Sequence, residues 1–306
     1  MTGGRDGAVR ATELRTTFIL NPVSGRTAMR PGRREKVEQF IARHQLDARL
    51  EITQLRGHAT ELARAAIAAG SQLVVSVGGD GTMNEVAAGV VGRDVLYGML
   101  PTGSGNGLGR DLGLPMDFGR ALDVLLDGMV RTIDTGVVCG FPFFNVMGLG
   151  FDAEIGRRFN ECHGRGFFNY IQIGLRAFFA YRKERISVEA EGVAPFTVDA
   201  FLASVANSTQ YGNNARIAPR ARLDDGRLDF AAVTTSNLIL AVPLVVRLFT
   251  RSIDRSRFVR AVQAPRFRIR RAAPGPVHTD GEIHPCPADL EVVIRPQSLR
   301  VVVPRL

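Results

Sequence analysis

Long hydrophobic runs are missing from this sequence of 306 residues. The longest apolar stretch, Leu238 to Val246, has nine residues and contains Pro243, whereas a membrane-spanning helix needs about 20 apolar residues. The first fifteen residues are polar and mixed in charge, so they lack the apolar core of a secretion signal. We therefore expect a cytoplasmic protein in which residues 1–14 form a disordered tail.

Cysteine and lysine are also scarce. Cys139, Cys162 and Cys286 show no CxxC spacing and cannot build a disulfide framework, which indicates a reduced protein. Lys36 and Lys183 are the only lysines, and neither stands in a GxxxxGK[ST] motif, so a Walker-type nucleotide site is excluded. The net charge of +9 is therefore carried by arginine. Because the arginines are mostly scattered, we expect no nucleic-acid partner.

The first 130 residues alternate between strand and helix signals. Thr16 to Leu20 and Leu73 to Val77 are apolar runs of the kind found in strands that are covered on both faces. Ala59 to Ala69 and Thr82 to Val91 have the composition and spacing of helices. This alternation predicts an α/β nucleotide-binding domain with a mostly parallel sheet over residues 15–132.

The pattern changes after Thr132, where β-like runs such as Ile186 to Glu191 and Thr197 to Ala206 are separated by turn clusters. It predicts an antiparallel β-sandwich-like domain over residues 133–294, which we expect to bind a lipid substrate. Residues 295–306 form a further predicted strand, and we consider its return to the first domain. Since no linker separates the two halves, the cleft between them is the expected site.

The clearest motif is the glycine-rich segment Gly78 to Glu85, which follows a predicted buried strand and opens a helix. Its three glycines allow backbone N–H groups to approach a phosphate without interference from Cβ atoms. The N-terminus of the following helix adds a partial positive charge. We expect Asp80 near a metal-bound polyphosphate, and Thr82 both capping the helix and binding a phosphate oxygen. An ordinary turn needs only one glycine, so this segment favours a phosphate site.

Two further loops follow predicted strands in the same way. Asn21 to Arg26 comes after the first strand, and Pro101 to Gly107 comes after the apolar run Val95 to Leu100. The carboxyl ends of parallel strands meet at one edge of a sheet, where open α/β sheets bind ligands. Three such loops at one edge predict a nucleotide pocket.

The segment His278 to Glu282 places two acids around Gly281. One of these carboxylates could accept the proton of an attacking hydroxyl. An Asp-Gly pair is equally typical of a solvated hairpin turn, and this alternative stays open. His278, His284 and Cys286 also suggest zinc, but no fourth ligand has a suitable spacing.

These motifs occur in the order seen in the diacylglycerol kinase catalytic family, which includes bacterial lipid kinases and the sphingosine and ceramide kinases. The resemblance covers about Thr16 to Pro304. It implies a first domain similar to those of NAD kinase and phosphofructokinase. The motifs that carry it are Asn21-Pro22-x-Ser24-Gly25, Gly78-Gly79-Asp80-Gly81-Thr82-x-Asn84-Glu85, Pro101-x-Gly103-Ser104-x-Asn106 and Asp280-Gly281-Glu282.

The resemblance implies an ATP-dependent lipid kinase in which Glu282 is the general base and Asp80 is oriented on the metal–phosphate. It also implies the set of residues that bind ATP: Asn21, Ser24, Gly25, Thr53, Gly78, Gly79, Asp80, Gly81, Thr82, Asn84, Glu85, Gly103, Ser104 and Asn106.

A structural magnesium site is implied by the similarity of the turn Leu223-Asp224-Asp225-Gly226 to a loop of the family. Asp225 would bind Mg²⁺ through its side chain, and Arg222 and Arg227 through their backbone carbonyls. Asp134 would join through a water molecule. Oxygen ligands of this kind suit Mg²⁺.

Two departures from the family pattern leave the acceptor lipid open. Gly107 stands where bacterial diacylglycerol kinases usually have an acid, which makes this loop more similar to the sphingosine-kinase form, and Arg26 replaces the usual lysine of the first loop. A diacylglycerol, a sphingoid base, a ceramide or another glycerolipid would each offer a primary hydroxyl. Such an acceptor implies peripheral association with an anionic membrane surface.

Two apolar stretches are candidates for that association. Arg165 to Arg185 and Leu238 to Phe249 would each suit an interfacial helix or a helix packed on the second domain. Two other functions also stay open, a kinase of a soluble acceptor similar to NAD kinase and a non-catalytic protein that binds nucleotide or anionic membranes. The oligomeric state is open as well, with a homodimer as one option.

Overall fold

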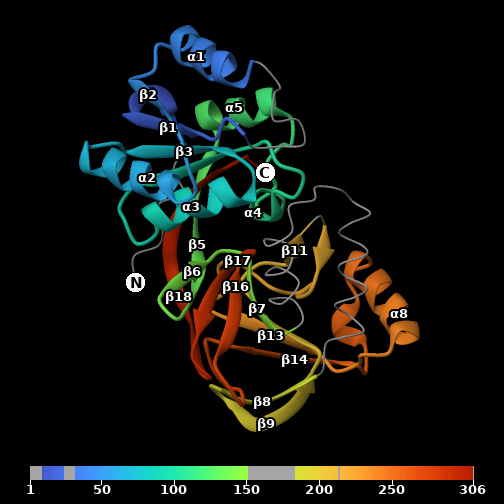
Figure 1. The fold of residues 1–306 in the computed structure, drawn as a ribbon. Coiled ribbons are helices and arrows are strands. Elements are labelled where there is room, and N and C mark those ends of the chain that lie inside the picture. The colour runs from blue at the N-terminus through green and yellow to red at the C-terminus, as the bar shows by residue number, and fades with distance from the viewer. Residues whose placement is uncertain (1–8, 24–31, 151–182, 213, 306) are drawn as a thin grey trace. The chain divides into compact units, whose positions relative to one another are not determined.

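The computed structural model describes residues 9–23, 32–150, 183–212 and 214–305 (Figure 1). Contacts between residues divide the chain into two compact units. The first comprises Met1–Asp134 and Pro296–Leu306, and the second comprises Thr135–Arg295. Ser24, Gly25 and residues 165–182 of the predicted helix Arg165 to Arg185 lie outside the described residues.

A parallel sheet with the strand order β2-β1-β3-β4-β18 forms the centre of the first unit. In chain order the elements are a 3-10 helix at Ala11–Glu13, β1 Thr16–Leu20, α1 Arg33–Arg43, β2 Ala48–Ile52, α2 His58–Ala68, β3 Leu73–Gly78, α3 Asp80–Val90, β4 Leu96–Pro101, α4 Gly107–Asp111, α5 Phe118–Asp127, β5 Met129–Val138 and β18 Asp289–Val303.

The register of this sheet brings the carboxyl ends of four strands together. Leu20 at the end of β1 is opposite both Ile52 of β2 and Val77 of β3. Gly78 of β3 is in turn opposite Pro101 of β4. Strands β1, β3 and β4 are buried along their whole length, as expected for parallel strands with both faces covered. The loops that follow these strands therefore start from one edge of the sheet.

Helices α2 and α3 pack closely because α3 has a glycine at the contact. A Cβ atom on Gly89 would lie 2.7 Å from the Cβ of Ala63 and 2.9 Å from the carbonyl oxygen of Thr60. No side chain fits there without moving the backbone of α2. This contact holds α3 against α2 and so helps to position the N-terminus of α3.

The second unit consists of antiparallel strands. One sheet has the order β14-β13-β10-β7-β16-β17, and β15, β8 and β9 follow the first part of β18 in the other. The elements are β6 Phe141–Phe143, β7 Val146–Gly150, β8 Glu184–Ala190, β9 Val193–Ala200, β10 Leu202–Ala206, β11 Gln210–Gly212, β12 Ala215–Arg216, β13 Leu228–Val233, α8 Leu238–Phe249, a 3-10 helix at Ile253–Arg255, β14 Val259–Ala264, β15 Arg266–Arg270, β16 Gly275–Thr279 and β17 Glu282–Cys286.

One apolar cluster fills the space between these two sheets. It contains Val188 of β8 and Phe267 of β15 from one sheet, and Met147 of β7 and Phe230 of β13 from the other. Each of these four side chains is at most 1% exposed. The parallel first sheet and the antiparallel, sandwich-like second unit confirm the predicted fold class.

The predicted strand Thr197 to Ala206 is wrong as a single element. The chain leaves β9, which pairs with β8, and enters β10, which pairs with β7 and β13 in the other sheet. Phe201 lies at this crossing and donates its N–H to the carbonyl of Val233. Within the described residues, no helix is long and apolar enough to cross a membrane.

Gly136 provides a test of the packing in the second unit. It lies opposite Phe143 in the β5–β6 pair, and a Cβ atom on Gly136 would overlap the ring of Phe143, which is fully buried. Gly136→Ala is therefore expected to lower the free energy of unfolding by about 1–3 kcal/mol, as overpacking does. Urea denaturation followed by circular dichroism would measure the change.

The matched control is the double variant Gly136→Ala/Phe143→Leu. The smaller side chain should relieve the overlap, so the double variant should be more stable than the sum of the two single effects predicts. Simple additivity would contradict the proposed overlap.

Candidate functional site

The N-terminus of α3 presents backbone N–H groups at the carboxyl edge of the first sheet. Gly79 is its N-cap residue in an extended conformation, and no described side chain caps the helix. The first intrahelical bond runs from the N–H of Met83 to the carbonyl of Gly79, and the N–H groups before it have no partner inside the helix. Gly81 is exposed, and a Cβ atom there would meet nothing within 4 Å. This end of α3 has the room and the polarity to bind an anion.

Asp80 links its own segment, Gly78 to Glu85, to the loop Pro101 to Gly107, which is the third loop along the chain. Its Oδ2 accepts a hydrogen bond from the N–H of Asn106 at 2.8 Å, and its Oδ1 accepts one from the N–H of Gly107 at 2.7 Å. Asn106 and Gly107 are the N-cap and first residue of α4, so the carboxylate also stabilises the positive end of that helix. The sequence did not predict this contact, and the role of Asp80 on a metal–phosphate stays a prediction.

The glycines of these loops allow two stretches of backbone to touch. A Cβ atom on Gly103 would lie 2.8 Å from the Cα of Gly79, and one on Gly105 would lie 2.5 Å from the Oδ2 of Asp80. Asn106 closes the third loop, because its side chain accepts from the N–H of Gly103 at 3.0 Å and donates to the same residue's carbonyl at 2.8 Å. Gly79, Gly103 and Asn106 are thus brought together around Asp80.

The first loop reaches the same helix through Asn21. The Nδ2 of Asn21 donates to the Oγ1 of Thr82 at 3.0 Å, and its Oδ1 accepts from the N–H of Val23 at 3.0 Å. The predicted cap by Thr82 is wrong, since Thr82 is the third residue of α3 and no side chain caps that helix among the described residues. Thr53, which follows β2, is buried and donates its N–H to the carbonyl of Leu20.

Glu85 faces a neighbouring helix. Its Oε2 accepts from the N–H of Ala59 at 3.2 Å, and its carbonyl accepts from the hydroxyl of Thr60 at 2.7 Å. Both partners belong to the first turn of α2, so Glu85 binds the positive end of that helix. Ser104 is exposed in the third loop, and Asn84 is half-buried on α3. ATP contacts for Asn84, Glu85 and Ser104 stay predictions.

In the second unit, the carboxylate of Asp280 accepts three backbone hydrogen bonds. The donors are the N–H groups of Phe144, Asn145 and Val146 at 2.7–2.9 Å. Burial raises the pKa of the Asp280 carboxyl above its ordinary value, and the three N–H groups and His278 oppose that shift. Asp280 thus anchors its turn to the chain between β6 and β7.

Glu282 lies two residues further on, at the start of β17, and is exposed. Thr279 pairs with Glu282 across the two-residue turn Asp280-Gly281. Both turn residues have positive φ, 50° and 89°, as a type I′ hairpin requires. The hairpin alternative is therefore confirmed, but the turn is not simply solvated, because the carboxylate of Asp280 is hydrogen-bonded beneath it while Glu282 is exposed.

A buried polar group beside this turn was missed by the sequence analysis. The N–H groups of Asn207 and Ser208 donate to the carbonyl of Asn145, and the Ser208 hydroxyl donates to the Oδ1 of Asn145. Next to them, Gln210 is 1% exposed, and neither atom of its side-chain amide has a partner in the described structure. No spacing in the sequence distinguishes these residues from an ordinary polar turn.

The zinc interpretation of the same hairpin finds no support in the side-chain contacts. The Nδ1 of His278 accepts from the N–H of Gly281 at 3.3 Å, and the ring of His284 stacks on Phe141 with its Nε2 at 2.8 Å from the Oγ1 of Thr279. Burial, together with a hydrogen bond to Cys139, raises the pKa of the Cys286 thiol to about 12.

The predicted magnesium ligands are divided between the units. The carboxylate of Asp225 accepts from the N–H of Arg227 at 3.1 Å and from the Nε2 of Gln263 at 3.2 Å. Asp134 belongs to the first unit, where it is buried and accepts from the N–H of Gln297 at 2.7 Å. Among the described residues, no three His, Cys, Asp or Glu side chains form a metal-binding group. The magnesium site formed by Asp225, Arg222, Arg227 and, through water, Asp134 stays a prediction.

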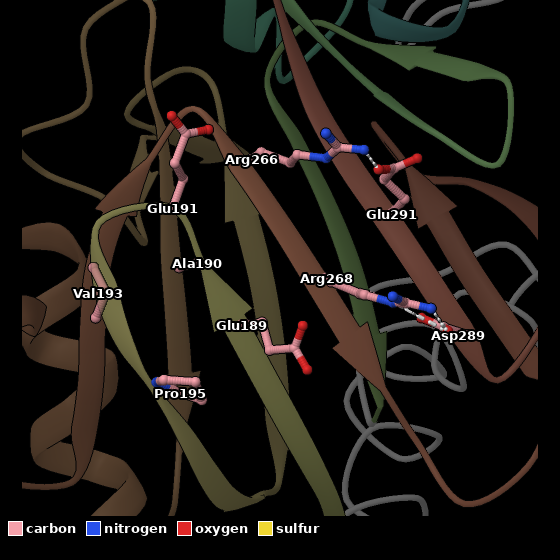
Figure 2. A pocket seen from close by; sticks show the side chains of 9 residues that line it. All are labelled: Glu189, Ala190, Glu191, Val193, Pro195, Arg266, Arg268, Asp289 and Glu291. Carbon is pink, nitrogen blue, oxygen red and sulfur yellow. Dashed lines mark hydrogen bonds and ion pairs between the residues drawn. The ribbon is translucent and has the colours of Figure 1, made fainter.

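A groove of about 770 Å³ lies on the outer face of strands β8, β9, β15 and β18 (Figure 2). Arg266 pairs with Glu291, and Arg268 pairs with Asp289. Glu189 and Glu191 add two more carboxylates to the lining. Four acids against two arginines make this groove a poor site for a triphosphate.

Comparison with known proteins adds independent information. Residues 15–138 match the family model of the diacylglycerol kinase catalytic domain, and residues 145–303 match that of the YegS C-terminal NAD kinase beta sandwich-like domain. A diacylglycerol kinase of Mycobacterium tuberculosis is 28% identical over 311 residues, which cover 98% of each chain. A YegS-like lipid kinase of Chromohalobacter salexigens is 30% identical over 89% of this chain and 87% of its own.

Solved structures share the fold at lower identity. The crystal structure of a diacylglycerol kinase from Bacillus anthracis has a TM-score of 0.72 at 19% identity, with 95% of this chain and 98% of that chain covered. An NAD kinase from Archaeoglobus fulgidus in complex with ATP has a TM-score of 0.54 at 12% identity, with 94% and 93% covered. At these identities the likeness shows the fold alone.

The contact of Asp80 with the third loop can be tested by Asp80→Asn. The side-chain amide keeps the shape of the carboxylate but has one accepting oxygen and no charge, so it cannot accept both N–H bonds. The free energy of unfolding should therefore fall by about 1.5–3 kcal/mol. Amide hydrogen exchange at Asn106 and Gly107 should become faster. Urea denaturation and exchange detected by mass spectrometry would measure the two effects.

Asp123→Asn on α5 is the matched control, because Asp123 is an exposed aspartate of the same unit. It should change neither quantity. Unchanged exchange at Asn106 and Gly107 in Asp80→Asn would contradict a linking role for the carboxylate.

Proposed function

Because the chain belongs to the diacylglycerol kinase family, we propose that it transfers the γ-phosphate of ATP to the primary hydroxyl of a lipid such as a diacylglycerol or a sphingoid base. The observation that carries the proposal is the convergence of Asn21 and two glycine-rich loops at the N-terminus of α3, which no described side chain caps. Each unit corresponds largely to one of the two matched family domains. The acceptor and the individual roles below are parts of the proposal.

The triphosphate of ATP binds at the N-terminus of α3. Backbone N–H groups in the first turn and the helix dipole favour negative charge there. A phosphate needs open space, which is present over Gly81, and the close contact of Gly79 with Gly103 forms one side of that space. Asn21, Thr53, Ser104 and Asn106 lie on the strand ends and loops that surround this position.

Glu282 acts as the general base. It accepts the proton of the lipid hydroxyl while the hydroxyl oxygen forms a bond to the γ-phosphorus and the bond from that phosphorus to the bridging oxygen of ADP breaks. The buried carboxylate of Asp280 holds the hairpin from below through three N–H groups. This leaves Glu282, an exposed carboxylate on a rigid turn, for the proton transfer.

Magnesium is the metal that the family implies. Bound to ATP, it would neutralise charge on the polyphosphate, and Asp80 is the candidate carboxylate to hold it. The oxygen donors of the Asp225 turn, with the carbonyls of Arg222 and Arg227, fit a second, structural Mg²⁺ in their chemistry. Asp134 is the remaining member of that proposed set.

The acceptor resides in a membrane, so we propose a cytoplasmic protein that associates with an anionic bilayer. The buried amide of Gln210, which can both donate and accept, is a candidate to bind a polar group of the acceptor. Transfer of labelled γ-phosphate to lipids in mixed micelles with Mg²⁺ tests the function. Label in the organic phase supports a lipid kinase, label in water alone indicates a soluble acceptor, and ATP binding without transfer indicates a non-catalytic protein.

The phosphate site can be tested at Gly81. Gly81→Asp fits the fold, because a Cβ atom there meets nothing within 4 Å, but it puts a negative charge where the triphosphate binds. ATP affinity should fall at least roughly tenfold, the effect of about 1–2 kcal/mol that charge at a helix N-terminus has. Isothermal titration calorimetry at two salt concentrations would measure it.

Gly81→Asn is the neutral control of nearly the same size. It should lose much less affinity than Gly81→Asp, and the gap between the two variants should narrow at high salt. Equal losses in both variants would mean that shape rather than charge is responsible, and unchanged affinity in both would place the triphosphate elsewhere.

The general base can be tested by Glu282→Gln. Removal of the carboxylate should lower the turnover number by about 10² to 10⁴, while ATP affinity and the unfolding midpoint stay unchanged because the side chain is exposed. Steady-state phosphorylation of the lipid found in the micelle assay measures the effect. Glu191→Gln, an exposed glutamate of the same unit, should retain wild-type turnover. Wild-type turnover in Glu282→Gln would exclude the assignment.

A further inference from the structure

Among the described side chains of helix α8 in the second unit, those that are exposed are all apolar. Five of them are at least half exposed: Ile239 at 81%, Val242 at 61%, Val245 at 51%, Val246 at 55% and Phe249 at 55%. Pro243 is exposed among them. Because residues three and four apart lie on one side of a helix, these positions form a single continuous stripe.

The opposite face of α8 is apolar as well. Leu244 is buried, and Leu248 packs on the small cluster formed with Ile253 and strand β13. Apart from Arg247, which is half-buried and donates to the carbonyl of Ser252, every residue of α8 is apolar, and a helix of this composition is normally covered on every side. The outward face of α8 therefore calls for an apolar environment that the described part of the chain does not supply.

The last turn of this helix and the chain that follows it are strongly basic. Residues 247–260 contain five arginines (Arg247, Arg251, Arg255, Arg257 and Arg260) against one acid, Asp254. Asp254 is itself paired with Arg220 at 3.0 Å. An apolar stripe beside unbalanced arginines is the pattern of a helix that lies in the plane of a membrane interface.

We infer that α8 docks the protein on an anionic phospholipid bilayer, with the stripe from Ile239 to Phe249 among the acyl chains and the arginines at the headgroups. Charge favours this occupant over a second copy of the chain, because two such faces would bring their arginines together. Twelve residues are too few to span the hydrocarbon core, which needs about 20. The helix therefore lies on the bilayer and does not cross it.

Binding to sucrose-loaded vesicles tests the inference directly. The wild-type protein should sediment with phosphatidylcholine vesicles containing about 30% phosphatidylglycerol, and at least tenfold less with phosphatidylcholine alone. Val242→Asp should weaken binding to the anionic vesicles at least tenfold, since it places a charge in the apolar stripe. Arg251→Gln/Arg255→Gln should remove most of the preference for anionic lipid and leave the apolar stripe intact.

Leu55→Asp is the matched control, because Leu55 is an apolar residue of the first unit with 69% exposure. It should bind vesicles as the wild type does. Absence of wild-type binding to both vesicles, or wild-type binding by Val242→Asp, would overturn the inference. So would a change from dimer to monomer in Val242→Asp with unaltered vesicle binding, which would assign the stripe to self-association.

An activity measurement links this surface to the proposed function and rests on it. Val242→Asp should lower phosphorylation of a long-chain acceptor in anionic vesicles about tenfold and leave phosphorylation of a dispersed short-chain diacylglycerol unchanged. Equal losses on both acceptors would count against docking. If the wild type phosphorylates neither acceptor, the proposed function fails, while the vesicle measurements still decide the role of α8.

Discussion

The candidate phosphate site depends on one interaction, the carboxylate of Asp80 with the N–H groups of Asn106 and Gly107. These bonds draw the third loop onto the N-terminus of α3. The approach is so close that a Cβ atom at Gly103 or Gly105 would collide with Gly79 or with Asp80 itself. Gly79, Gly103 and Gly105 are thus the glycines that the contact between the loops requires. Gly81, with open space beside it, is the position where the motif leaves room for a ligand.

A second carboxylate organises the other unit in the same physical way. Asp280 accepts three backbone N–H bonds beneath its turn, much as Asp80 accepts two. Charge-assisted bonds of this type hold a loop rigidly at the cost of burying a charge. In both units an exposed group stands one or two residues from the acid that accepts these bonds, the backbone at Gly81 in the first unit and the side chain of Glu282 in the second. In the second unit the acid that holds the turn and the proposed base are therefore different residues, whereas Asp80 both holds the loops and is the proposed carboxylate for the metal–phosphate.

The sequence predicts the first unit better than the second, for reasons that lie in the patterns themselves. Parallel strands buried on both faces are continuous apolar runs. The predicted strand Thr16 to Leu20 therefore has the observed bounds, and the predicted strand Leu73 to Val77 ends one residue before the observed one. In the sandwich, the chain passes from one sheet to the other at Phe201 without any turn residue, and a single apolar run hides the crossing. The contact between Asp80 and Asn106 joins residues 26 positions apart. No local pattern records it, although the glycines that permit it are visible.

The chain has a net charge of +9, and in the second unit the arginines are paired with acids on one surface and outnumber the acids on another. On the outer face of the sandwich, Arg266 pairs with Glu291 and Arg268 with Asp289 (Figure 2). Arg270 pairs with Glu189 on the same face, so this surface offers little attraction to an anion. Next to α8, five arginines face a single acid within fourteen residues. Screening confines the effect of each charge to about 8–10 Å at physiological salt, so local balance decides which surface an anionic partner meets. The excess positive charge therefore acts beside the apolar stripe, where a bilayer offers both the acyl chains and the anionic headgroups that this surface lacks.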